Sequence, residues 1–168
     1  MNAETCNIDE IKNLIPHRYP FLLIDKVIDI VKNESATGVK NVTVNEPYFP
    51  GHFPASPVVP GVLQIESMAQ TAAVLVAKSL NISSSNALVL LTTIDNAKFR
   101  KPVIPGDVMS LVISVKKIRN KLWKFGGQVI VESQKVSECE FSAMMRICLL
   151  YTSPSPRDLS TSRMPSSA

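Results

Sequence analysis

The chain has 168 residues, of which 45% are hydrophobic, and this suits one domain with a substantial core rather than a disordered protein. Eighteen Lys and Arg against 14 Asp and Glu give a formal net charge of +4, but the basic residues are scattered, which argues against a nucleic-acid partner. No apolar run approaches the roughly twenty residues of a membrane span, and the polar N-terminus is not a signal peptide.

The chain begins with a short predicted helix. Ile8, Ile11 and Leu14 recur at helical spacing, Asn7 has the side chain of an N-cap, and Pro16 ends the pattern. Beyond it, branched apolar stretches alternate with turns, and one long stretch is apolar on more than one helical face. The later predicted elements are strands over 21–31 and 37–44, a helix over 61–80, and strands over 87–99, 108–118, 122–133 and 136–147.

The last four predicted strands follow one another through short turns, with Asn120 and Lys121 as the expected hairpin. The sheet is therefore expected to be antiparallel. A helix as apolar as residues 61–80 needs cover on most sides, which a sheet provides by curling around it. The predicted class is α+β, with an antiparallel sheet wrapped around one long central helix in a single domain over residues 1–147.

The composition changes at Cys148. Residues 148–168 lack an amphipathic period and end in Ser and Pro, and they resemble the translation of a sequencing-library adapter. The alternative is a disordered tail, and both interpretations exclude the segment from the domain. Cys6, Cys139 and Cys148 show no paired spacing, so they are predicted to be free thiols in a reducing, cytoplasmic compartment.

Glu66 is the only acidic residue between Glu46 and Asp95, and it lies in the apolar helix. An unpaired carboxylate buried there would cost several kcal/mol, so Glu66 needs a partner or a chemical role. Desolvation favours the neutral form of a carboxylic acid, and a neutral acid can donate a proton.

The sequence contains two histidines, His17 and His52. His52 lies in a loop rich in proline, and such a loop positions an imidazole without an ordering cost at each turnover. A catalytic and a structural role for His52 carry equal weight on the residues alone. His17, in the loop before the first predicted strand, is interpreted as a structural residue.

Gly61 follows Pro60 and opens the long helix. The first N–H groups of a helix lack internal acceptors, and a residue without a side chain lets a carbonyl oxygen approach them. The alternative is that Gly61 fits a tight loop-to-helix junction. A base (His52), an acid (Glu66) and this donor suit abstraction of a proton beside a carbonyl, with loss of a β-leaving group. The two side chains could come from two subunits.

The chain resembles the bacterial 3-hydroxyacyl-[acyl-carrier-protein] dehydratases of the FabZ type in four motifs that occur in the family's order. They are Leu14–Asp25, Phe49–Pro54, Pro60–Gln70 and Phe99–Asp107. The resemblance implies a hot-dog fold, a homodimer that assembles as a trimer of dimers, and dehydration of (3R)-hydroxyacyl thioesters on acyl carrier protein. It implies neither a metal nor an organic cofactor.

By position, His52 matches the family's catalytic histidine, and Glu66 matches its acidic partner from the neighbouring subunit. Gly61 matches the backbone donor to the thioester carbonyl. Arg100 and Lys101 fall where the family's rim meets the acidic carrier protein. Two alternatives remain at this point, a hot-dog thioesterase that activates water and an acyl-binding domain without catalysis.

Overall fold

The computed structural model describes residues 4–83 and 87–147, so the predicted tail at 148–168 lies outside the described residues. Within these residues, seven strands form one antiparallel sheet in the order β1-β2-β3-β5-β6-β7-β4. The elements in chain order are β1 (Glu4–Cys6), α1 (Ile8–Leu14), β2 (Lys26–Val31), β3 (Ser35–Asn41), α2 (Gly61–Leu80), β4 (Ala87–Phe99), β5 (Val108–Arg119), β6 (Leu122–Val131) and β7 (Gln134–Ile147).

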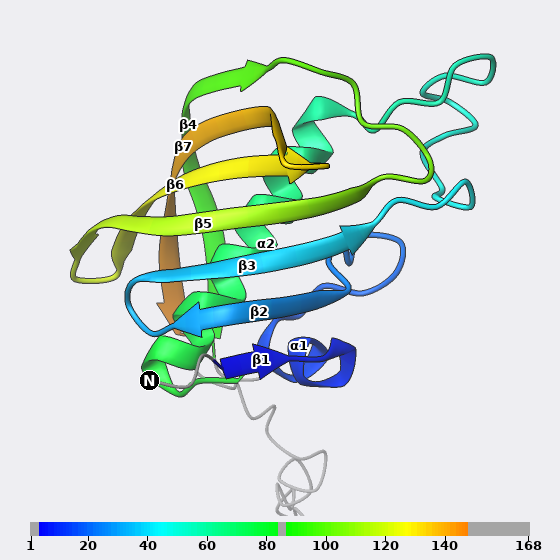
Figure 1. The fold of residues 1–168 in the computed structure, drawn as a ribbon. Coiled ribbons are helices and arrows are strands. Elements are labelled where there is room, and N and C mark those ends of the chain that lie inside the picture. The colour runs from blue at the N-terminus through cyan, green and yellow to red at the C-terminus, as the bar shows by residue number, and fades with distance from the viewer. Residues whose placement is uncertain (1–3, 84–86, 148–168) are drawn as a thin grey trace, which may run out of the picture.

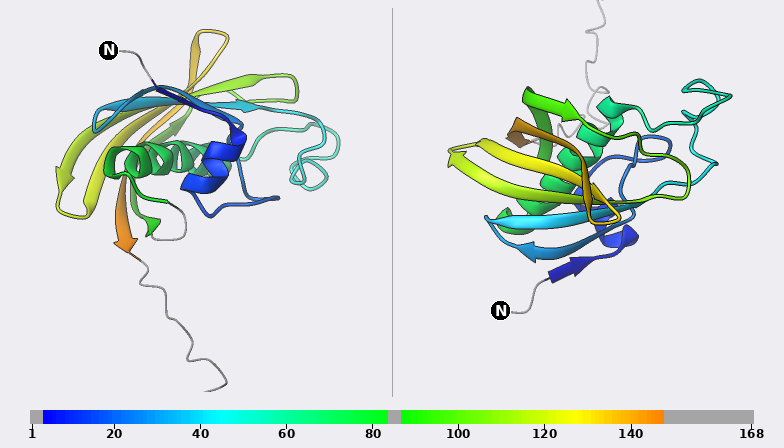
Figure 2. Two further views of the ribbon diagram at one scale, coloured as in Figure 1. Left: turned by 90° about the horizontal axis from the view of Figure 1, so that it is seen from below. Right: turned by 45° about the horizontal axis from the view of Figure 1, so that its top comes forward.

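The sheet curves around α2, and α1 lies beside the same helix (Figure 1, Figure 2). This arrangement confirms the predicted hot-dog fold. The loop between β3 and α2 extends beyond the sheet, next to the first turn of α2 (Figure 1). Strands β1 and β4 are the two edges of the sheet. Neither helix in the described part of the chain is long and apolar enough to cross a membrane.

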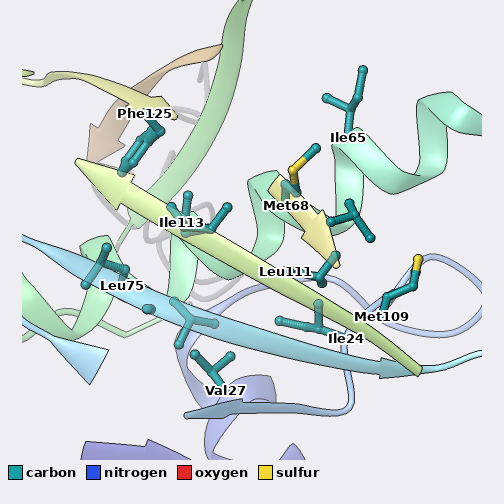
Figure 3. Packing of buried hydrophobic residues seen from close by; sticks show 14 of the residues in the cluster. Ile24, Val27, Ile65, Met68, Leu75, Met109, Leu111, Ile113 and Phe125 are labelled. Carbon is teal, nitrogen blue, oxygen red and sulfur yellow. The ribbon is translucent and has the colours of Figure 1, made fainter. Parts of the chain in front are cut away.

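The long helix is buried because the sheet meets it on several sides. Met68 and Leu75 of α2 belong to one buried cluster with Ile113 and Phe125 of the sheet (Figure 3). Gly127 in β6 permits the close approach, since a Cβ atom there would lie 2.7 Å from the Met68 sulfur. The backbone of α2 is therefore fixed relative to the sheet, and so are the side chains on its first turns.

The first helix is capped as the sequence predicts. The Asn7 side chain accepts hydrogen bonds from the N–H groups of Asp9 and Glu10, and the Glu10 carboxylate accepts from the Asn7 N–H. At the other end, Arg18 Nη1 donates to the Ile15 carbonyl at 2.9 Å. These contacts fix the start of the loop that follows α1.

The first two predicted strands are shorter in the structure. Strand β2 begins at Lys26 rather than at residue 21, because the preceding backbone bonds to a helix side chain instead of a strand. The Leu23 N–H donates to Gln70 Oε1, and the Phe21 carbonyl accepts from Gln70 Nε2, both at 2.8 Å. The second strand covers Ser35–Asn41 rather than 37–44. Strand β1 was not predicted, because three residues carry too little pattern.

Candidate active site

His52 is held by backbone hydrogen bonds within its own loop. Its N–H donates to the Tyr48 carbonyl at 2.9 Å, and its carbonyl accepts from the Val58 N–H at 3.1 Å. The ring Nδ1 lies 2.7 Å from the Val58 carbonyl oxygen. Since a carbonyl can only accept, Nδ1 carries the proton of the neutral ring and Nε2 keeps a lone pair. Phe53 stacks on the imidazole, with ring centroids 4.1 Å apart.

Gly61, the first residue of α2, borders the same cavity as His52. The volume of this cavity is about 590 Å³. Pro60 is the N-cap and makes no side-chain capping hydrogen bond. The Leu63 N–H donates to the Pro60 carbonyl, whereas the Gly61 and Val62 N–H groups have no acceptor among the described residues and keep their donor capacity. A Cβ atom on Gly61 would lie 2.7 Å from the Phe99 ring. The close approach of Phe99 is one reason for glycine here, and it leaves the donor role open.

Arg100 and Lys101 also line the His52 cavity. Arg100 is paired with the Glu138 carboxylate, and Lys101 donates to the Gln134 side chain. Hydrogen bonds from Lys135 and then Arg100 lower the pKa of Glu138. Among the residues that the structure describes, the lining of this cavity thus includes two basic residues and no acidic residue.

Glu66 lines a different cavity, of about 260 Å³, which it shares with Phe21, Ala73 and Leu91. Its side chain is 22% exposed in the single chain, so it is only partly buried. One carboxylate oxygen, Oε1, accepts a hydrogen bond from Gln70 Nε2 at 2.9 Å. The other, Oε2, makes no hydrogen bond within residues 4–83 and 87–147.

The structure brings His17 next to Glu66, which the sequence did not predict. His17 Nε2 lies 3.4 Å from Glu66 Oε1, although 49 residues separate the two positions. Gln70 was also missed as a residue of this site. Glu66 and Gln70 are four residues apart on one helix, and this spacing was a usable signal for their contact.

Within one chain, His52 and Glu66 line separate cavities, and strand β4 borders both. Phe99, at the end of β4, lines the His52 cavity, while Leu90 and Leu91, near its start, line the Glu66 cavity. Within a single chain, His52 and Glu66 therefore do not form one acid–base pair. Among the described residues, no group of three or more His, Cys, Asp or Glu is arranged to hold a metal ion.

The chain is similar to known proteins in sequence. Residues 15–140 match the family model of the FabA-like domain. The chain is 56% identical over 142 residues to the 3-hydroxyacyl-[acyl-carrier-protein] dehydratase FabZ of Rickettsia bellii, covering 84% of this chain and 97% of that protein. It is 52% identical over 141 residues to the FabZ of Rhodospirillum rubrum, covering 84% and 88%.

Solved structures share the fold at low sequence identity. The dehydratase heterocomplex ApeI:P from Xenorhabdus doucetiae superimposes with a TM-score of 0.69 at 18% identity, over 81% of this chain and 90% of that one. Cj0977, a virulence protein from Campylobacter jejuni, gives a TM-score of 0.58 at 14% identity, over 82% and 88%. From the family match and the identities above, this chain belongs to the FabA-like family and, within it, to the FabZ-type 3-hydroxyacyl-[acyl-carrier-protein] dehydratases.

Proposed function

We propose that the chain dehydrates (3R)-hydroxyacyl thioesters on acyl carrier protein to trans-2-enoyl thioesters, a cytoplasmic step of fatty-acid synthesis. Relatives that share more than half of its aligned residues are named for this activity. The observation in the structure that carries the proposal is that His52 and the start of α2 border one cavity. A base and an N–H donor for the carbonyl oxygen are thereby available to the same thioester.

The reaction needs one proton removed and one supplied. His52 Nε2 takes the proton from C2 of the acyl chain, and the electron pair moves toward the thioester carbonyl, whose oxygen accepts from the Gly61 N–H. The C2–C3 double bond then forms as the C3–O bond breaks, and neutral Glu66 protonates the leaving hydroxyl to give water. The cycle ends when the proton on His52 leaves and Glu66 is protonated again.

Strand β4 supports a dimer that joins the His52 and Glu66 cavities. It is an edge strand of 13 residues, and Leu90, Leu91, Ile94 and Phe99 on it are 37–50% exposed. A long apolar edge of this kind favours pairing with a second copy. Two-fold antiparallel pairing about the middle of β4 brings the Phe99 end of one copy beside the Leu90 end of the other. The His52 cavity of one chain then meets the Glu66 cavity of its partner.

The variant Ile94→Lys tests this pairing. Ile94 is 49% exposed on β4, and a charge there opposes an apolar strand-to-strand contact. We expect Ile94→Lys to sediment as a monomer with turnover close to background. Ile118→Lys is the matched control, because Ile118 is 43% exposed on β5, away from that edge. A fully active Ile94→Lys monomer would contradict the shared site. Assembly of three such dimers stays a prediction.

The basic rim supports acyl carrier protein as the carrier of the substrate. Lys101 lines the His52 cavity and is exposed, so it can meet an acidic partner without burying its charge. Lys101→Glu is expected to raise KM for a carrier-bound substrate, and to leave KM for a short thioester of a small thiol unchanged. An equal change for both substrates would contradict carrier recognition at this rim.

One assay separates the proposed reaction from thioester hydrolysis. The chain is mixed with a 3-hydroxyacyl thioester, and the enoyl absorbance and the free thiol are followed together. Dehydration raises the absorbance without releasing thiol, whereas a thioesterase releases thiol. Neither signal is expected from a domain that only binds acyl chains. Thiol release at the rate of substrate loss would overturn the proposal.

A further inference from the structure

His17 lies beside Glu66 but has no part in the reaction above. Its Nε2 atom is 3.4 Å from Glu66 Oε1, and the two side chains are 23% and 22% exposed. The other ring nitrogen, Nδ1, is buried and has no hydrogen-bond partner among the described residues. A proton on Nδ1 would be a buried donor without an acceptor, which is costly. The neutral ring therefore carries its proton on Nε2, toward Glu66.

Gln70 contacts the same carboxylate oxygen from another direction. Its Oε1 accepts from the Leu23 N–H at 2.8 Å, while its Nε2 donates to the Phe21 carbonyl at 2.8 Å and to Glu66 Oε1 at 2.9 Å. The amide uses its oxygen and both of its hydrogens, so it cannot turn without losing hydrogen bonds. Two N–H groups thus converge on Oε1 of Glu66.

The loop that carries His17 is itself fixed. Arg18 Nη1 donates to the carbonyl groups of His17 at 2.6 Å and Ile15 at 2.9 Å, and the Phe21 N–H donates to the Arg18 carbonyl at 2.7 Å. The imidazole is therefore held from the backbone side while its Nε2 faces α2. This is the geometry of a group that orients a neighbour.

We propose that His17 is a positioning residue for Glu66. Together with Gln70 it keeps Oε1 as the hydrogen-bond acceptor of the neutral acid, so that the acidic proton resides on Oε2. Oε2 is then the oxygen that meets the leaving hydroxyl of the substrate. The inference rests on the proposed function. A distance of 3.4 Å is longer than a normal hydrogen bond, and contacts of this kind tighten when the substrate is bound.

Two substitutions in the full chain separate the donor from the shape of the ring. His17→Gln places an amide N–H near the position of Nε2, whereas His17→Leu fills similar volume without a donor. We expect His17→Leu to lower kcat by about 10–50-fold with KM changed less than about twofold, and His17→Gln to stay within about threefold of the wild type. Should His17→Leu unfold, His17→Asn replaces it, since its shorter amide does not reach Glu66.

A third comparison tests whether His17 acts through Glu66. In a Glu66→Gln background, His17→Leu should lower kcat no further, because the acid that it orients is already gone. The inference would be overturned if the losses in kcat from Glu66→Gln and His17→Leu multiplied in the double variant. It would also be overturned if His17→Gln were as slow as His17→Leu, or if His17→Leu kept the wild-type kcat. Full turnover by Glu66→Gln itself would instead overturn the proposed function.

Discussion

The His52 loop and the Glu66 turn of α2 hold their functional side chains in different ways. His52 is oriented by backbone atoms of Tyr48 and Val58, both within six residues of it. Glu66 accepts a hydrogen bond from the Gln70 side chain and lies 3.4 Å from His17, and Gln70 is itself bonded to the loop before β2. One region is locally determined, and the other depends on a contact across 49 residues of sequence.

The difference explains how each region should respond to substitution. We expect the orientation of His52 to tolerate changes elsewhere in the fold, because the hydrogen bonds of this residue come from Tyr48 and Val58 of its own loop. The orientation of Glu66 is lost when the loop before β2 or the amide of Gln70 is disturbed. The orientation of the proposed base, His52, thus depends on its loop, and the orientation of the proposed acid, Glu66, depends on the tertiary structure.

The largest expected loss of kcat follows from replacing His52, the proposed base. His52→Ala removes the lone pair that takes the C2 proton and is expected to lower kcat by about 10³–10⁴-fold. The fold should persist, because the loop backbone keeps its bonds to Tyr48 and Val58. Steady-state kinetics with circular dichroism checks both points. Turnover at the wild-type rate would contradict the assignment.

A somewhat smaller effect is expected for the acid. Glu66→Gln keeps the shape of the side chain but cannot protonate the leaving hydroxyl, and we expect kcat to fall by about 10²–10³-fold. KM should change little, because the amide can still hydrogen-bond to the substrate. A large rise in KM with kcat preserved would mean that Glu66 binds the substrate rather than acting as an acid.

The protein should lose stability when Gln70, which hydrogen-bonds α2 to the loop before β2, is replaced. Gln70→Leu leaves the Leu23 N–H and the Phe21 carbonyl without their partner, which is expected to cost about 2–4 kcal/mol of unfolding free energy. Gln64→Leu is the comparison in α2, because Gln64 is similarly buried but, among the described residues, its side chain bonds to the Ser137 hydroxyl alone. Urea unfolding should show that Gln70→Leu is less stable than Gln64→Leu. The reverse order would contradict a stabilising role for the hydrogen bonds of Gln70.

The smallest effect concerns Cys139, which contributes to neither region. Burial raises the pKa of its thiol from 9.0 to about 11. The folded state therefore binds this proton more tightly than the unfolded state does. The associated stability is complete below about pH 9 and is lost as the pH rises toward 11, with about 1.4 kcal/mol lost by pH 10. The unfolding free energy of Cys139→Ala should decline less over this pH range than that of the wild type. An identical decline would contradict the raised pKa of the Cys139 thiol.

Local pattern predicted most of the fold. The bounds of α2 follow from Pro60 and Gly61 at its start and from the apolar residues after them, and the structure confirms them. The hairpin at Asn120 and Lys121 is likewise confirmed. The prediction of a strand from residue 21 was wrong because the Phe21 carbonyl and the Leu23 N–H bond to Gln70, a tertiary contact that β-propensity does not contain.

The surroundings of His52 could be predicted from the sequence better than the surroundings of Glu66. A rigid loop around His52 follows from its prolines, and its proximity to Gly61 follows from the short chain between them. The contact of His17 with Glu66 has no pattern in the sequence, because it exists only once the loop after α1 packs on α2. The separation of His52 and Glu66 into two cavities is likewise a result of the fold.

The most direct test of the central claim uses dimers that contain one His52→Ala chain and one Glu66→Gln chain, purified through two different tags. If each site takes its base from one chain and its acid from the other, one of the two sites in such a dimer is intact. The account predicts about half of the wild-type kcat per dimer, from two nearly inactive parents. Activity no higher than that of the parents would contradict a shared site.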